Sequence, residues 1–335
     1  SNGPWKLAEW VHDSYIKMVP NEYHYDAANL GPNSLTFQLM EDQNSMLAAY
    51  RSGDLQFIED MPVDEIAGLL ASGELNIVDY IGTYYVCYQT QKAPFDDPRV
   101  RQAFTLAVDR TYIVEQITQT GQVEAGGYVP AGVYDAAGAT GDDFRTVGGD
   151  YYAPTDADYE ANCERARELL AEAGYPDGFS TTLWCSDTQV MRDSAVVIQE
   201  QLRQVGINAE VKTLESGQFQ SETGNGAHDM FIMSKTSIDP DSMLRSMYHT
   251  EALGPSGNRC FWTTPEVDAL IDEASTTTDT EHAMELYAEI QGKVAEAAPL
   301  VPMAVEHLNA GMQSNVKGFG LYPGKSHYIN GTYFE

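Results

Sequence analysis

Apolar and polar residues alternate along the first part of the chain, and this pattern predicts β-strands. Residues 3–19 combine aromatic and β-branched side chains in short alternating runs, as strands typically do. Residues 35–39 repeat the alternation, with their leucines and phenylalanine on one face. Residues 46–52 show helical spacing instead and end at a glycine, and residues 55–58 follow as a short strand. Residues 83–91 are again extended.

Residues 98–109 carry the clearest helix signal. Asp97 has a side chain that caps helix N-termini, and Pro98 suits the first helical position. Apolar residues then recur at helical spacing, so one face of the helix should be buried. That face consists of Val100, Ala103, Phe104, Ala107 and Val108. The arginines expected to point away from it are Arg99, Arg101 and Arg110. No nucleophile lies beside a base here, so the pattern indicates a structural helix.

Helices and strands alternate in the second half of the chain. The predicted elements are helices at 159–173 and 190–205, and strands at 179–185, 207–214 and 228–233. Glycines end both helices, and the order of elements favours parallel strands covered by helices. Two further helices follow, the first capped by Thr264 with Pro265 at its first position. The tail from residue 300 returns to strands like those at the start. The sequence therefore predicts an α/β fold in which one lobe is inserted into another.

The charge balance argues against several classes of partner. Fifty acidic and 19 basic residues give a formal net charge of −31. Nucleic acids and anionic membranes are bound through Lys and Arg, so neither partner is expected. Two explanations of the acidity stay open: solubility, as in a saline habitat, and electrostatic steering of a substrate. No apolar run approaches the roughly 20 residues of a membrane span.

Four cysteines and scattered histidines give little sign of a metal site. Cys87, Cys163, Cys185 and Cys260 form no CxxC pair, and the spacing of zinc fingers is absent. The cysteines could be buried thiols or two disulfides. The expected packing of helix 159–173 on the strand after it suggests a bridge between Cys163 and Cys185.

Enzyme motifs are also missing from the sequence. None of the seven histidines belongs to an HExxH pair, and there is no GxSxG. Residues 121–158 are rich in Gly, Ala, Asp, Tyr and Pro and have no clear period, which predicts a long irregular segment. That segment has neither GxGxxG nor a phosphate-binding Gly-Lys-Ser/Thr. A Cys–His nucleophile stays open as a minor alternative.

Several segments together resemble one protein family. They are NGPWKLAEW, YRSGDLQFIEDMP, KAPFDDPRVRQAFTLAVDR, ARELLAEAGYPDGF, QEQLRQVGINAEV and TPEVDALIDEA. In this order they resemble the solute-binding proteins of ABC importers, in the subfamily that serves oligopeptides, dipeptides and nickel. The resemblance implies a two-lobed α/β fold like that of type II periplasmic binding proteins. In that family the helix corresponding to 98–109 is scaffold.

The resemblance also implies how the chain divides. NGPWKL is an internal segment in the family, so we expect this chain to be a fragment that lacks an N-terminal part. Residues 1–82 would belong to lobe I, residues 83–304 would form a complete inserted lobe II, and residues 305–335 would return to lobe I.

Function follows from the same resemblance as an expectation. The family members bind a solute between two lobes that close about a hinge, and they deliver it to a membrane permease. We therefore expect a monomeric, extracytoplasmic binding protein that is no enzyme and needs no cofactor or metal. Its solute could be a peptide, or a metal chelate, sugar conjugate or anionic molecule. An enzyme on a related scaffold, and a chaperone or signalling receptor that reuses the fold, remain alternatives.

The stretch MFIMSKTSIDPDSML is the most informative about the ligand. The family's peptide binders carry Gly-Trp and then Asp-Tyr before an Asp-Pro, and that first aspartate holds the peptide amino terminus. Here Ser234 and Lys235 stand in place of Gly-Trp, and the amine-binding aspartate has no clear counterpart. Lys235 and Arg259 would instead favour a ligand that carries a carboxylate or phosphate. Asp239 could bind ligand or cap a helix, and Asp241 would suit the dipole of that helix.

Four aromatic residues complete the candidate site. Tyr84 and Tyr85 fall in the region where the family's chain crosses between lobes, which suggests that they line the pocket. Trp184 ends a predicted parallel strand, where ligands often collect, but it could equally be a core residue. Trp262, like Arg259, could contact the ligand or lie on the surface.

Overall fold

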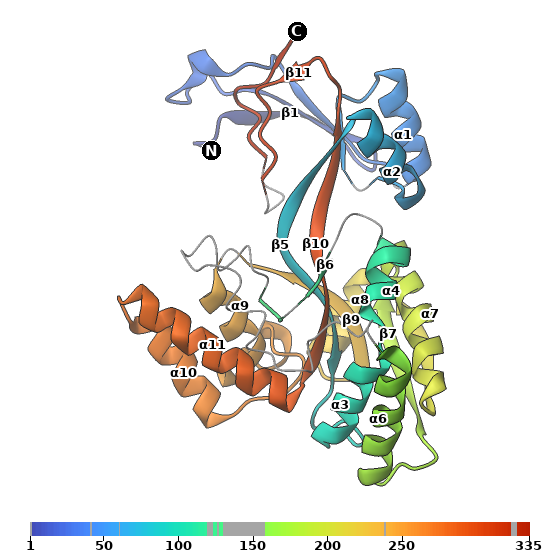
Figure 1. Ribbon diagram of the computed structural model, residues 1–335. Helices are drawn as coiled ribbons and strands as arrows, with labels where there is room; N and C mark the ends of the chain where they lie inside the picture. The colour runs from blue at the N-terminus through green and yellow to red at the C-terminus, as the bar shows by residue number, and fades with distance from the viewer. Residues whose placement is uncertain are drawn as a thin grey trace. The chain divides into compact units, whose positions relative to one another are not determined.

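The computed structural model describes residues 2–40, 42–59, 61–118, 123–125, 127–129, 158–237, 239–322 and 327–335. The chain forms two compact units. The first unit comprises Ser1–Asp79 and His307–Glu335, and the second comprises Tyr80–Glu306. Most of the irregular segment predicted at 121–158 lies outside the described residues. Figure 1 shows the elements of both units.

The first unit is built from both ends of the chain. Its elements are β1 (Trp5–Val11), β2 (Tyr15–Pro20), η1 (Ala27–Asn29), β3 (Leu35–Gln38), α1 (Gln43–Ser52), β4 (Phe57–Glu59), α2 (Val63–Ser72), β11 (Val316–Lys317) and β12 (Tyr333–Phe334). Strands β1, β2 and β3 form an antiparallel sheet in that order. The indole Nε1 of Trp5 donates to Oδ1 of Asn330 at 3.0 Å, so residues near the two ends of this unit are joined directly.

A small core lies between the helices of the first unit. Asp42 caps α1 by accepting a hydrogen bond from the Ser45 amide, and Gly53 ends it in the left-handed conformation. The buried apolar residues are Leu47, Tyr50, Ile58, Met61, Ile66, Leu69 and Leu75. The strand and helix predicted at 46–58 are therefore present, whereas α2 was not predicted.

The second unit contains most of a mixed sheet. The strands that build this sheet are β5 (Leu75–Tyr88), β6 (Val123–Glu124), β7 (Phe179–Ser186), β8 (Ile207–Leu214), β9 (Met230–Thr236) and β10 (Leu300–Met312). The strand order is β4-β10-β5-β9-β7-β8, and β6 pairs with β10. Strand β7 is parallel to both β8 and β9, as the alternation of helices and strands predicts, whereas β5 and β9 are antiparallel. Both boundaries between the units fall inside long strands, β5 and β10.

Helices cover both faces of this sheet (Figure 1). The elements that do so, or connect those that do, are α3 (Pro98–Ala107), α4 (Arg110–Tyr112), η2 (Ile113–Thr118), α6 (Tyr159–Glu172), α7 (Gln189–Gln204), α8 (Ser216–Gly224), α9 (Pro240–Tyr248), η5 (Thr250–Ala252), η6 (Gly254–Ser256), α10 (Pro265–Thr276) and α11 (Thr280–Ala297). Helices α3, α6 and α7 pack on one face, and α9, α10 and α11 pack on the other.

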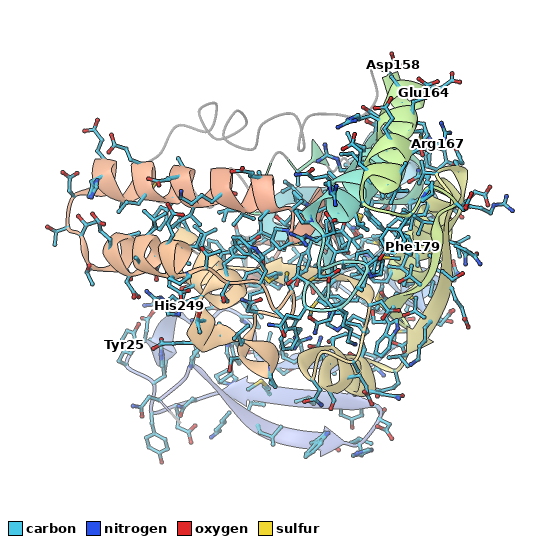
Figure 2. The ribbon with its side chains drawn as sticks, turned by 90° about the horizontal axis from the view of Figure 1, so that it is seen from below. Tyr25, Asp158, Glu164, Arg167, Phe179 and His249 are labelled. Carbon is cyan, nitrogen blue, oxygen red and sulfur yellow. The ribbon has the colours of Figure 1, made fainter. Side chains whose placement is uncertain are left out.

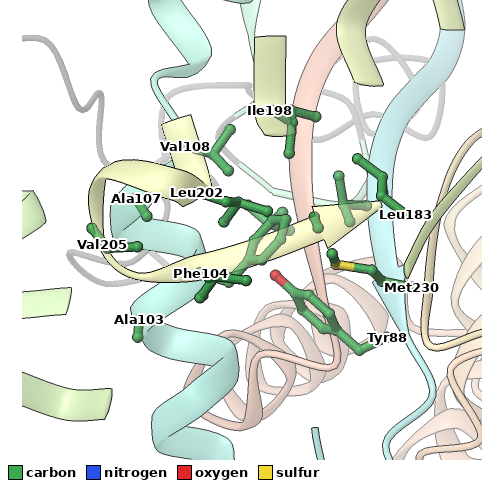
Figure 3. Packing of buried hydrophobic residues seen from close by; sticks show 14 of the residues in the cluster. Tyr88, Ala103, Phe104, Ala107, Val108, Leu183, Ile198, Leu202, Val205 and Met230 are labelled. Carbon is green, nitrogen blue, oxygen red and sulfur yellow. The ribbon is translucent and has the colours of Figure 1, made fainter. Parts of the chain in front are cut away.

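The period of two along each strand divides the core into two clusters. On β7, Leu183 and Cys185 belong to the cluster beside α3, α6 and α7, while Trp184 belongs to the opposite cluster. Met230 and Phe231 on β9 are divided in the same way. Figure 3 shows the first cluster packed around Phe104 of α3. Because both faces are buried there, consecutive residues are apolar at 183–185 on β7 and at 230–233 on β9.

Surface charges lie on the outward sides of the helices. On α6, Cys163 and Ala166 are buried, while Glu164 and Arg167 are exposed and lie on the outer side of the helix in Figure 2. The apolar stripe therefore decides which side of the helix faces the sheet.

Two expectations for the segment after Asp97 turn out differently. Asp97 caps α3 and Pro98 is its first residue, as predicted. Arg101 and Arg110, however, are buried, with exposures of 4% and 0%. Arg101 donates to the carbonyl oxygens of Phe95, Ala297 and Ala298, and Arg110 donates to those of Ala125 and Pro302. Because these carbonyl oxygens accept hydrogen bonds from the guanidinium groups, the two arginine side chains can be buried.

The predicted Cys163–Cys185 bridge is also absent. Cys163 and Cys185 are both buried and are not bonded to each other. Cys163 and Cys185 both lie in the cluster beside α3, α6 and α7, and the Sγ of Cys185 lies 3.6 Å from Oγ1 of Thr213. Helix α6 packs mainly against α3, whereas α7 packs against β7, so the two sulfur atoms are not brought together.

Candidate functional site

Two cationic side chains come together beside the last residues of β9. Lys235 lies opposite Thr83 in the β5–β9 register, and it shares a face of β9 with Met233, two residues earlier. Nη1 of Arg259 lies 3.8 Å from the sulfur of Met233 and donates to Oγ1 of Thr223 at 3.0 Å. The fold therefore brings Lys235 and Arg259, which are far apart in sequence, to one place.

Neither cation has an acidic partner among the described residues. Burial lowers the pKa of Lys235, and the positive charge of Arg259 lowers it further. Burial also lowers the pKa of Arg259. Removing a charge from water costs free energy unless an opposite charge or hydrogen bonds compensate. An anionic group placed here would relieve the repulsion between the two cations, and it would accept charge-assisted hydrogen bonds from both.

Asp239 acts as the N-cap of α9. Its carboxylate accepts from the amide and the hydroxyl of Ser242 at 2.7 and 2.8 Å. Asp241 lies in the first turn, and burial raises its pKa although Arg245 lies nearby. One carboxylate oxygen of Asp241, Oδ1, is buried without a hydrogen-bond partner among the described residues. The capping alternative for Asp239 is thus observed, and a ligand role for either aspartate stays a prediction.

Tyr84 and Tyr85 point to opposite faces of the sheet. Tyr85 is 2% exposed and packs edge-on against Tyr128 and Phe231, with ring centroids 5.4 and 6.2 Å away. Tyr84 is half-buried and packs against the other cluster, beside α3 and α7. Neighbouring residues of a strand cannot share a face, so at most one of these rings can line a given pocket within this sheet.

The two tryptophans also differ in their surroundings. Trp184 is 6% exposed, its Nε1 donates to Oγ1 of Thr182 at 2.9 Å, and the Lys212 ammonium lies 3.9 Å from its ring centroid. The structure thus places Trp184 in the core, beneath a cation–π contact. Trp262 is half-buried and packs edge-on against Tyr248, with ring centroids 5.9 Å apart. Ligand contact by either tryptophan stays a prediction.

Sequence reasoning missed the residues that hold Arg259. Thr223 lies in α8, a helix without a recognisable amphipathic pattern, so no local signal pointed to it. Met233 ends the strand predicted at 228–233, and Lys235 lies two residues beyond it, so the prediction stopped short of the alternation that β9 shows. Within the described residues, no three His, Cys, Asp or Glu side chains are grouped so that they could hold a metal ion. No helix among these residues is both long and apolar enough to span a membrane.

A family profile matches most of the chain. Residues 1–254, about three quarters of the sequence, match the bacterial extracellular solute-binding proteins, family 5 Middle. The chain belongs to this family. The family is described as extracellular, in agreement with the resemblance seen in the sequence.

Curated relatives of this family are similar over almost the whole chain. The glutathione-binding protein GsiB of Salmonella typhimurium is 28% identical over 332 residues, and GsiB of Escherichia coli O157:H7 is 27% identical over the same length. Each alignment covers 96% of this chain but 62% of the relative. The chain thus spans less than two thirds of the length of these relatives.

Solved structures of the family show the same fold. OppA of Haemophilus influenzae in complex with RPPGFSPFR has a TM-score of 0.83 at 21% identity, covering 99% of this chain and 64% of OppA. DppA of Helicobacter pylori in complex with the peptide STSA has a TM-score of 0.81 at 23% identity, covering 99% and 63%. The predicted α/β fold of type II periplasmic binding proteins is confirmed. The two GsiB relatives are named as binding proteins, and the OppA and DppA structures contain bound peptides.

Proposed function

We propose that this chain is the solute-binding part of an ABC importer, working as a monomer outside the cytoplasm and passing its solute unaltered to a membrane permease. The family match over residues 1–254 carries the proposal. The similar proteins support it, since one is named for binding glutathione and two structures contain bound peptides. No catalytic step is part of the proposal, and the solute should be recovered chemically intact.

The solute should carry a carboxylate. Lys235 and Arg259 are half-buried cations without an acidic partner among the described residues, in a chain whose formal net charge is −31. A peptide meets this requirement through its terminal carboxylate. Glutathione, the ligand in the name of the GsiB relatives, carries two carboxylates. Metal chelates and sugar conjugates fit the two cations only if they are anionic.

The proposed site also includes aromatic and acidic residues. The residues that we expect near the solute, besides the two cations, are Tyr84 or Tyr85, Trp184 from its position in the core, Asp239, Asp241 and Trp262. The division into lobe I at 1–82 and 305–335, and lobe II at 83–304, is likewise part of the proposal.

Native mass spectrometry of the intact polypeptide that contains this sequence, purified without unfolding, should detect a retained solute. The second measurement is a calorimetric titration with that solute, or with glutathione and short peptides if none is retained. Each peptide is compared with its C-terminal amide. Replacing one charge-assisted hydrogen bond should weaken binding about 10- to 100-fold.

Lys235→Met should reproduce the loss seen with the peptide amide, and it should not add to that loss, because the two changes remove the same interaction. Lys293→Met is the matched control, since Lys293 forms surface ion pairs with Glu266 and Glu289 and should bind like the wild type. Equal affinity of Lys235→Met and wild type for the free acid would exclude the anion site. Turnover of the solute would exclude the transport role.

A further inference from the structure

Two buried cysteines far apart in the sequence meet in the second unit. The Sγ atoms of Cys87 and Cys260 lie 2.7 Å apart, although 173 positions separate the residues. Cys87 is on β5, and Cys260 lies in the segment before α10. Both side chains are completely buried, in the cluster on the α9, α10 and α11 face of the sheet.

Backbone hydrogen bonds hold the two segments against each other. The amide and the hydroxyl of Thr90 both donate to the carbonyl oxygen of Cys260, at 3.0 and 2.9 Å. The side-chain amide of Gln91 donates to the carbonyl oxygen of Phe261 at 3.2 Å. The neighbours of both cysteines are thus fixed by contacts that do not involve sulfur, so the fold itself sets the approach of the thiols.

The separation of the sulfur atoms distinguishes a covalent bond from other pairings. Non-bonded carbon atoms stay about 3.5–4.0 Å apart, and sulfur is the larger atom, so 2.7 Å is too short for simple packing. Two thiolates that share a tetrahedral metal ion, each about 2.3 Å from it, would lie about 3.8 Å apart. The sulfur of Met247 lies 3.9 Å from the Sγ of Cys260, but the 2.7 Å between the two cysteine sulfur atoms is still too short for a shared metal ion. A disulfide needs about 2.05 Å, which the two side chains reach by moving about 0.7 Å.

We propose that Cys87 and Cys260 form a disulfide that joins β5 to the segment before α10. The oxidant is a small-molecule or protein disulfide. One cysteine, as thiolate, attacks it, forms a mixed disulfide and releases one thiol. The second cysteine then attacks the mixed disulfide, forms the Cys87–Cys260 bond and releases the second thiol. Two protein thiols are oxidised, the oxidant gains two electrons, and the two protons pass to its thiols.

Burial restricts when this reaction can take place. Burial and the hydrogen bond that Cys87 donates to Cys260 raise the pKa of the Cys87 thiol, and the thiolate is the attacking species. Exchange therefore takes place while the chain folds, or when this part of the molecule opens, in an oxidising compartment. Cys163 and Cys185, in the opposite cluster, remain thiols. The proposal is independent of the identity of the solute.

The direct test counts thiols in the wild-type polypeptide. The protein is unfolded in urea and refolded in the presence of glutathione disulfide. It is then denatured again without reductant, its free thiols are alkylated, and its mass is measured. We expect two alkylated cysteines before reduction and four after it, with a cross-linked peptide that contains Cys87 and Cys260. Four alkylated cysteines after oxidation, or a bridge between other residues, would overturn the proposal. A bound metal ion whose chelation frees both thiols would also overturn it.

A stability measurement gives the second readout. A bridge across so long a loop should raise the Tm by roughly 5–10 °C, so dithiothreitol should lower it by that amount. Cys260→Ser should make the Tm insensitive to dithiothreitol. Cys163→Ser, the matched buried control, should keep both the bridge and the sensitivity. The same Tm with and without dithiothreitol, in wild-type protein shown by mass to be oxidised, would exclude a stabilising bridge.

Discussion

Acidification should destabilise the protein through one buried imidazole, that of His228. The ring is 0% exposed, and neither of its nitrogens has a hydrogen-bond partner of acceptable geometry among the described residues. It packs edge-on against Phe231, with ring centroids 4.7 Å apart. Burial lowers its pKa from 6.5 to about 3, and the nearby positive charge of Lys92 adds to that effect. Smaller contributions come from Asp229 and the backbone of Arg259, which favour protonation, and from the Arg259 charge, which opposes it.

The sign and size of the effect follow from linkage. His228 takes up a proton near pH 6.5 in the unfolded chain but only near pH 3 in the folded one. Above pH 6.5 the imidazole is neutral in both states, so its lowered pKa does not change the free energy of unfolding. That free energy falls as the pH decreases from 6.5 towards 3. At about 1.4 kcal/mol per pH unit, the loss is about 2 kcal/mol at pH 5 and about 3 kcal/mol at pH 4.

His228→Phe isolates this contribution from that of the many carboxylates. A phenyl ring suits the aromatic surroundings and brings no unpaired nitrogens, so the variant should be at least as stable as wild type at pH 7. Urea unfolding followed by tryptophan fluorescence and circular dichroism at pH 7, 5 and 4 gives the difference in free energy of unfolding. Relative to the wild type, the free energy of unfolding of the variant should rise by about 3 kcal/mol between pH 7 and pH 4.

The control is His12→Asn, a histidine replacement on the exposed surface, which should not reproduce the gain seen with His228→Phe. A constant difference between wild type and His228→Phe from pH 7 to 4 would refute the reasoning, since it would mean that His228 takes up its proton equally in the folded and unfolded chain.

Three substitutions test the scaffold by urea unfolding at pH 7. Gly178→Ala should lower the free energy of unfolding by at least about 2 kcal/mol more than Gly174→Ala. Both glycines have positive φ, but only at 178 would a Cβ meet the carbonyl of Gly206. Equal losses would show that the backbone moves aside. Asp239→Ala should cost about 1 kcal/mol, whereas Asp239→Asn keeps most of the cap; a large loss in Asp239→Asn would point to a role for the charge. Arg101→Met should cost about 2–4 kcal/mol, because it leaves three carbonyl oxygens without their donor; a neutral result would mean that water replaces the guanidinium.

Elements with strong local signals could be predicted from the sequence. Asp97 and Pro98 marked the start of α3, and Thr264 and Pro265 marked that of α10, because capping depends on neighbouring residues. The parallel pairing of β7 with β8 followed from the order of helices and strands. These features depend on residues close together in the chain, or on rules that hold for most α/β proteins.

Features that depend on distant residues could not be predicted. The charges of Arg101 and Arg110 suggested exposed positions, but their partners are backbone carbonyls, some nearly 200 positions away, and a carbonyl leaves no trace in the sequence. Helix α8 has Phe219 as its buried large apolar residue, so its pattern is too weak to recognise. It is stabilised by Glu215, which accepts from two amides of the first turn.

Only part of the candidate site could be predicted from the sequence. Lys235 and Arg259 could be chosen from their charge, but their convergence required the β5–β9 register and the contacts with Thr223 and Met233. The opposite orientation of Tyr84 and Tyr85 follows from the strand period and could have been stated in advance. The sulfur contact between Cys87 and Cys260 depends on how the segment before α10 folds back over β5, which no local pattern encodes.

The construction of the first unit from both ends of the chain affects the order of biosynthesis. The ribosome completes the whole second unit before it reaches residue 307, so that unit can fold while translation continues. Strand β4, in contrast, must wait for its partner residues 310–312, and Trp5 waits for Asn330. Trp5 and strand β4 are thus translated long before their partners, and a premature stop before residue 307 would leave a finished second unit while these earlier residues stay unpaired.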